Sequence, residues 1–177
     1  RSSTKTMNPK ALWAWQVRVL QKAYAQRLPR EYQRGTVTPD WLRRLAQLSW
    51  SDHGPRLARE YVMKAGIHFV VEHHLQKTYL DGAACRTREG SPVVALTLRY
   101  DRVDNFWFTL LHELSHVGLH LDHGTEWFVD DLECADTSTL EREADEMASE
   151  ALIPKAVWER SVPRSAREVE ALARELG

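Results

Sequence analysis

Apolar residues in the first third of the chain recur at the spacing of amphipathic helices, and three such segments follow one another. The first begins at Pro9, and its apolar side chains are expected near one helical face: Leu12, Trp15, Val19 and Tyr24. The second, TPDWLRRLAQLSW, opens with Thr38 as N-cap and Pro39 at the first helical position. The third, GPRLAREYVMKAG, is expected to end at Gly66, because glycine commonly follows the last helical residue.

The pattern changes to that of β-strands after this glycine. β-Branched and aromatic residues in IHFVVE predict a strand at residues 67–71. The segment YLDGAACRTREGSPVVALTLRY accommodates two more strands, the second at residues 93–98, with a turn at Gly90 before it. The sequence therefore predicts a small sheet in the middle of the chain.

Helical spacing returns in the last part of the chain. Apolar residues dominate residues 106–119, so this helix is expected to be largely buried. An acidic connector follows at residues 122–138, and Pro154 interrupts the next helix, LEREADEMASEALIP. The final segment starts at Ser165 with Glu168 three residues later, the spacing of a capping box. Helices, then a small sheet, then helices indicate an α+β domain.

Composition places the chain among ordinary globular proteins. Of its 177 residues 43% are hydrophobic and 28% are charged, which differs from the composition of disordered chains. No apolar run approaches the roughly 20 residues of a membrane span, so we expect no membrane association. The two cysteines, Cys85 and Cys134, are far apart and form no CxxC pair. This usage predicts a reducing compartment, the cytoplasm.

Charge is distributed unevenly along the chain. Residues 1–50 carry ten Lys and Arg against two acids, whereas residues 101–160 carry fifteen Asp and Glu against four Lys and Arg. No nucleic-acid-binding motif accompanies the basic segment, so a solvated helical face is the favoured interpretation and direct nucleic-acid binding is not expected. We predict a basic helical extension at residues 1–50 and a catalytic domain at residues 51–177.

The buried helix contains HELSH, which fits the pattern H-E-x-x-H. His112 and His116 lie one helical turn apart, so their imidazoles can converge on one zinc ion. Glu113 lies between them in sequence and can take a proton from a water as general base. Two histidines and a glutamate in a buried helix are costly unless they bind something. The motif therefore predicts one Zn²⁺ with His112 and His116 as ligands.

Several residues are candidates for a third protein ligand. Asp122 lies at the position of the third ligand in metzincins, but the glycine of that motif is displaced by one residue. His120 lies about 12 Å along the helix from His112, which favours a role in orienting a ligand. The later helix offers its glutamates: Glu141, Glu143, Glu146 and Glu150.

Among these glutamates we favour Glu141. Asp145 follows it by one helical turn and is suited to accept the outer N–H of a ligand histidine. A simpler alternative is that Ser138 and Glu141 form a capping box and that the glutamate has no metal role. A further donor for the transition-state oxyanion is also needed, and Tyr100, His120 and His123 are candidates.

The two segments DNFWFTLLHELSHVGLHL and EREADEMASEALIP together resemble the ImmA/IrrE family of zinc metallopeptidases, over roughly residues 55–160. The resemblance implies a minimal zincin-like fold, in which a small twisted sheet packs on the HExxH helix and a backing helix. It implies that His112, His116 and Glu141 hold zinc and that Glu113 is the general base. Asp145 occupies a position that is often Asn or Asp in this family.

The resemblance also implies a substrate and a way of binding it. Members of the family cleave helix-turn-helix repressors and so derepress stress, toxin–antitoxin or phage-defence genes. An extended substrate is expected to pair with an edge strand of the sheet, formed by Val93, Val94, Ala95, Leu96 and Thr97. The segment MNPKALWAWQVRVL is similar to the connector of members fused to a HigA-type helix-turn-helix antitoxin, whose DNA-binding domain would precede residue 1.

Two other functions are compatible with these residues. One is a regulatory or antitoxin-associated sensor module with a structural or ligand-binding zinc site and little proteolysis. The other is a non-peptidase zinc hydrolase. Glu113 favours the peptidase, because a purely structural site has no use for a general base.

Overall fold

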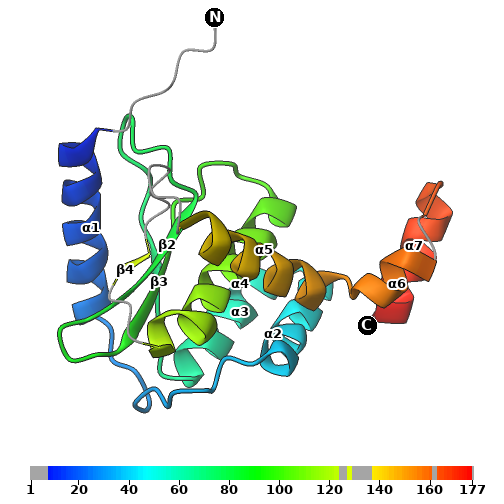
Figure 1. The fold of residues 1–177 in the computed structure, drawn as a ribbon, viewed down its shortest axis with the longest axis horizontal. Coiled ribbons are helices and arrows are strands. Elements are labelled where there is room, and N and C mark those ends of the chain that lie inside the picture. The colour runs from blue at the N-terminus through cyan, green and yellow to red at the C-terminus, as the bar shows by residue number, and fades with distance from the viewer. Residues whose placement is uncertain (1–7, 124–126, 129–136, 161–162, 177) are drawn as a thin grey trace, which may run out of the picture.

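A computed structural model describes residues 8–123, 127–128, 137–160 and 163–176, and its elements follow the predicted order (Figure 1). The helices are α1 (Pro9–Tyr24), α2 (Pro39–Ala46), η1 (Gln47–Trp50), α3 (Gly54–Lys64), α4 (Val103–Leu119), η2 (Leu121–His123), α5 (Thr137–Leu152), α6 (Lys155–Arg160) and α7 (Ala166–Leu176). The strands are β1 (His68–Val71), β2 (Gly82–Arg86), β3 (Pro92–Leu96) and β4 (Trp127–Phe128). The prediction of an α+β fold is confirmed, whereas most of the acidic connector lies outside the described residues.

Local signals place most helix ends where the sequence predicts them. The Thr38 hydroxyl accepts the backbone N–H of Trp41 at 3.2 Å and caps α2, and Gly66 follows α3 with a φ of +84°. The expectation that Tyr24 shares the buried face of α1 is wrong, because it is half-exposed while Trp15 is fully buried. Nine residues at 100° each place the two side chains half a turn apart.

The order of the strands corrects one prediction. Within the described residues the sheet has the order β1-β3-β2-β4, with β3 parallel to β1 and antiparallel to β2. Thr97 continues the pairing, since its backbone N–H donates to the carbonyl of Asp81 at 2.9 Å. The prediction that residues 93–97 form an edge strand open to a substrate is therefore wrong, because both sides of β3 are paired.

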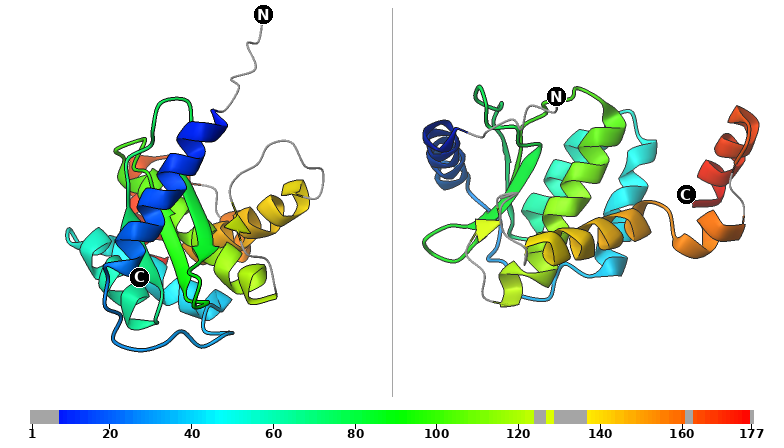
Figure 2. Two further views of the ribbon diagram at one scale, coloured as in Figure 1. Left: turned by 90° about the vertical axis from the view of Figure 1, so that its left-hand side faces the viewer. Right: turned by 45° about the horizontal axis from the view of Figure 1, so that its top comes forward.

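Helix α1 covers one face of the sheet (Figure 2), and polar side chains on it and just after it bond backbone carbonyls in and next to β1. On the face, its apolar residues Trp15, Val19 and Ala23 pack on side chains of all three long strands. At the edge, the indole N–H of Trp15 donates to the Glu72 carbonyl at 2.9 Å. The side chains of Lys22 and Gln26 reach the carbonyls of Val71 (2.8 Å) and Phe69 (2.7 Å).

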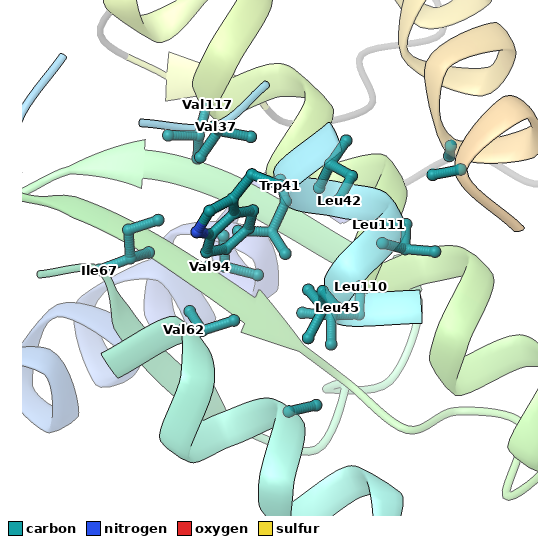
Figure 3. Packing of buried hydrophobic residues seen from close by; sticks show 14 of the residues in the cluster. Val37, Trp41, Leu42, Leu45, Val62, Ile67, Val94, Leu110, Leu111 and Val117 are labelled. Atoms are coloured by element: carbon teal, nitrogen blue, oxygen red, sulfur yellow. The ribbon is translucent and has the colours of Figure 1, made fainter. Parts of the chain in front are cut away.

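The opposite face of the sheet carries the larger core, built with α2 to α5 (Figure 3). Trp41, Leu42 and Leu45 of α2 meet Leu110 and Leu111 of α4 in this cluster. The first 50 residues thus contribute to both cores, and the division of the chain at residue 50 stays a prediction. No helix in the described part of the chain is long and apolar enough to cross a membrane.

Candidate metal centre

Helix α4 presents the HELSH residues toward α5 and the sheet. Its apolar residues, among them Leu110, Leu111 and Leu114, are fully buried. Their burial sets the rotation of the helix about its axis and so the direction of its polar side chains. His112 and His116 then lie with ring centroids 4.7 Å apart. His116 is only 1% exposed to solvent, and Glu113 is 6% exposed. The structure therefore brings two imidazoles and a carboxylate together inside the protein.

Helix α5 brings Glu141 to the same point. Its side-chain oxygens lie 3.1 Å from His112 Nε2 and 3.3 Å from His116 Nε2, and the two Nε2 atoms are 3.0 Å apart. A tetrahedral zinc ion with ligands about 2.0–2.1 Å away separates neighbouring ligand atoms by roughly 3.3 Å. Two imidazole nitrogens and one carboxylate at this spacing fit a zinc ion.

Close packing of the two helices makes this meeting feasible. Ala144 and Ala148 of α5 are fully buried against α4, and small side chains let helix axes approach closely. Glu141 lies in the first turns of α5, which begins at Thr137. Its contacts with two histidines account for it without the alternative of a capping box.

The cluster is electrostatically coupled. Burial disfavours the charged form of His112, but the hydrogen bond to Glu141 and the charges of Glu113 and Asp145 outweigh it and raise the His112 pKa to about 9. Burial lowers the pKa of His116, so its imidazole is neutral. Burial also opposes ionisation of Glu141, yet hydrogen bonds from both histidines lower its pKa to about 2. Glu141 is therefore an anion beside a neutral His116, as metal binding requires, whereas His112 must release its proton before it can be a ligand.

Both histidines also have contacts on their outer nitrogens. Asp145 Oδ1 lies 2.9 Å from His112 Nδ1. His120, which is buried with 6% exposure, lies with its Nδ1 2.9 Å from His116 Nδ1. His120 Nε2 in turn lies 3.2 Å from Glu143 Oε2. The structure thus brings Asp145 and His120 to the positions that the sequence predicts, and it adds Glu143.

Glu113 lies against strand β2. A Cβ atom placed on Gly82 would be 2.5 Å from Glu113 Oε1 and 2.8 Å from its Cγ. Only glycine therefore allows the carboxylate to lie this close to the strand. Glycine inside a strand commonly marks such a close approach, so Gly82 in the strand pattern is the signal in the sequence for this contact.

The remaining candidates, Asp122 as a metal ligand and Tyr100 and His123 as oxyanion donors, lie elsewhere or outside the described residues. Asp122 is held by the Arg86 guanidinium at 2.9 Å and by the hydroxyl of Tyr32 at 2.9 Å. Tyr100 is half-exposed, and the guanidinium of Arg99 lies 5.1 Å from its ring centre. The side chain of His123 lies outside the described part of the chain. Within that part, His112, His116 and Glu141 form the one group of three such residues with ligand atoms within 4.8 Å of one another.

Comparison with known proteins agrees with this arrangement. A search of curated proteins finds no match. The family model of the M78 peptidases, described as the IrrE N-terminal-like domain, matches residues 62–177. The match includes both helices of the metal centre, and it supports a metallopeptidase type of function. Since it spans well over half of the chain, this protein belongs to the IrrE N-terminal-like family of M78 peptidases.

Proposed function

We propose that the chain is a zinc-dependent endopeptidase with a zincin-like arrangement, in which His112, His116 and Glu141 hold the ion. The observation that carries the proposal is the convergence of these three side chains, with the buried carboxylate of Glu113 close enough for its charge to act on His112. When bound, Zn²⁺ supplies a Lewis acid that acidifies a water and polarises a carbonyl.

Glu113 then has the role of general base and general acid. Its carboxylate accepts a proton from the attacking water as the new C–O bond forms. It returns this proton to the amide nitrogen, which leaves as an amine when the C–N bond breaks. Contact with Gly82 fixes the carboxylate against β2, and this restriction lowers the cost of orienting the base.

The substrate is proposed to be a protein segment in extended form, paired with β2 in place of the rejected β3. In the described part of the chain, β4 pairs with only Ala84 and Cys85 of β2. Gly82 and Ala83 continue the same strand next to Glu113. A segment added here would bring its peptide bonds past the general base, with backbone hydrogen bonds as the main source of affinity.

The family assignment is the support for a helix-turn-helix repressor as the substrate. Cleavage of such a repressor would derepress stress, toxin–antitoxin or phage-defence genes. The alternative is a sensor module with a structural zinc ion, and the buried Glu113 argues against it because four-ligand structural sites need no base. Cys85 is a free buried thiol, and Cys134 lies outside the described residues. The state of one cysteine does not test the compartment, so the cytoplasmic location stays a prediction.

One experiment tests the proposal. Protein purified in parallel as wild type, Glu113→Gln and the exposed-residue control Glu146→Gln is analysed for zinc and incubated with a synthetic peptide library and with helix-turn-helix regulators of its host. Mass spectrometry reads the products. We expect about one zinc per chain in all three and cleavage by wild type and Glu146→Gln alone. Equal cleavage by Glu113→Gln, or no zinc in the wild type, would refute the proposal.

A further inference from the structure

His120 lies between a candidate metal ligand and a carboxylate from another helix. It follows His116 by one turn of α4, and the Nδ1 atoms of the two rings are 2.9 Å apart. Its other ring nitrogen lies 3.2 Å from Glu143 Oε2 on α5. His120 is 6% exposed and His116 only 1%. The three side chains therefore form a line from the metal centre to the half-exposed carboxylate of Glu143.

With a metal on His116 Nε2, the described contacts assign the protons along this line. A carboxylate only accepts, so His120 must carry its proton on Nε2 to bond Glu143. In neutral His120 the Nδ1 atom is then an acceptor, and it can only accept the proton from His116 Nδ1. This assignment leaves the lone pair of His116 on Nε2, as a bound metal requires, whereas without a metal the same atom contacts Glu141 at 3.3 Å.

The opposite assignment would disable the ligand. If His120 carried its proton on Nδ1, His116 Nδ1 would be the acceptor and His116 Nε2 would be protonated. A protonated Nε2 cannot bind a metal. His116 is almost completely buried, so solvent offers little help in selecting the right form. The partner of His120 therefore decides which form is favoured.

We infer that Glu143 is a positioning residue for the metal centre, which acts through His120 to hold His116 in the tautomer that binds zinc. The inference rests on the proposed zinc site. Asp145 contacts His112 Nδ1 directly at 2.9 Å, whereas His116 is reached through an intervening imidazole. Helix α5 thus supplies one ligand, Glu141, and the carboxylates that orient both of the others.

The intervening imidazole also transmits the effect of the Glu143 carboxylate to His116. When His116 binds a cation, its Nδ1–H becomes a stronger donor, and an acceptor backed by a carboxylate stabilises it better than an isolated imidazole. Loss of such an outer partner typically weakens metal binding by about 10- to 100-fold. Because Glu143 acts only through His120, its effect must vanish when His120 is removed.

This dependence is tested by a double-mutant cycle in zinc affinity, measured on the whole chain by competition with a chromophoric chelator. We expect His120→Ala and Glu143→Ala each to weaken zinc binding about 10- to 100-fold, and the double variant to bind no more weakly than His120→Ala. Glu143→Gln, which keeps an acceptor oxygen, should recover part of the loss. The control Glu146→Ala removes an equally charged, exposed side chain of α5 that pairs with Arg142, and should bind zinc as wild type does.

The outcomes separate the inference from the proposal on which it rests. A wild type that binds no zinc refutes the proposed function. A wild type that binds zinc while Glu143→Ala binds it equally well, or with an additive loss in the His120→Ala background, overturns the inference alone. Nitrogen-15 NMR of the zinc-loaded wild type gives a second measurement that needs no variant. It should show His120 protonated on Nε2, and protonation on Nδ1 would overturn the inference.

Discussion

Substitution of Gly82 by alanine tests the role of Glu113 without touching the glutamate itself. The added Cβ would lie 2.5 Å from Glu113 Oε1 and 2.8 Å from its Cγ, whereas ordinary contacts begin near 3.4 Å. The carboxylate must therefore move by about 0.9 Å. Misplacement of a catalytic group by about 1 Å costs on the order of 100-fold in rate, which corresponds to about 2.7 kcal/mol of transition-state stabilisation. Zinc affinity should stay close to that of the wild type, since Gly82 contacts no proposed ligand.

The assay compares kcat for one peptide taken from the library with zinc content and with the free energy of unfolding in urea. Gly118→Ala is the matched control, because its Cβ would lie 2.6 Å from the backbone oxygen of Val37. Gly118 lies on α4, the helix that also carries Glu113, but the clash at Gly118 does not involve Glu113. We expect Gly118→Ala to lose mainly stability and Gly82→Ala to lose mainly rate. A kcat for Gly82→Ala within twofold of the wild type would show that β2 does not control the catalytic position of Glu113.

Three further predictions concern stability, each measured by urea denaturation. Ala148→Leu overpacks the contact between α4 and α5, where Ala148 is fully buried, and should cost about 1–3 kcal/mol; an unchanged midpoint would contradict this. Trp15→Phe removes the donor to the buried Glu72 carbonyl and should cost about 1–3 kcal/mol; an unchanged free energy of unfolding would contradict this. Glu72 pairs with Lys22 and Arg18, which together outweigh burial and lower its pKa below 4.5. Its carboxylate thus stabilises the fold above pH 4.5 and loses this effect as the pH falls through the lowered pKa, so wild type and Glu72→Gln should converge in acid and differ at pH 7.

Local signals account for what the sequence predicts well. The spacing in HELSH is a property of one helix, so the meeting of His112 and His116 follows from helical geometry alone. Glu141 is harder to predict, because its approach to the histidines depends on the packing of α5 on α4, and Asp145 one turn later is the local signal for it.

Non-local pairing accounts for what the sequence does not reveal. The place of β3 in the sheet depends on which strands bond to both of its sides, and an apolar run such as PVVAL suits an interior strand as well as an edge. The contact of Glu143 with His120 joins residues 23 positions apart. The spacing of the two residues does not predict this contact, because it depends on how α4 and α5 pack against each other.

Helix α1 has a consequence for how the protein is handled in fragments. The family match begins at residue 62, so a fragment chosen by that boundary would lack Trp15, Lys22 and Gln26. The outward carbonyls of β1 and an apolar face of the sheet would then be bare, and bare edges of this kind pair with other chains. We expect residues 30–177, which keep α2 and α3 but lack α1, to self-associate in light scattering while the full chain does not. Helix α1 thus prevents strands of other chains from pairing with β1.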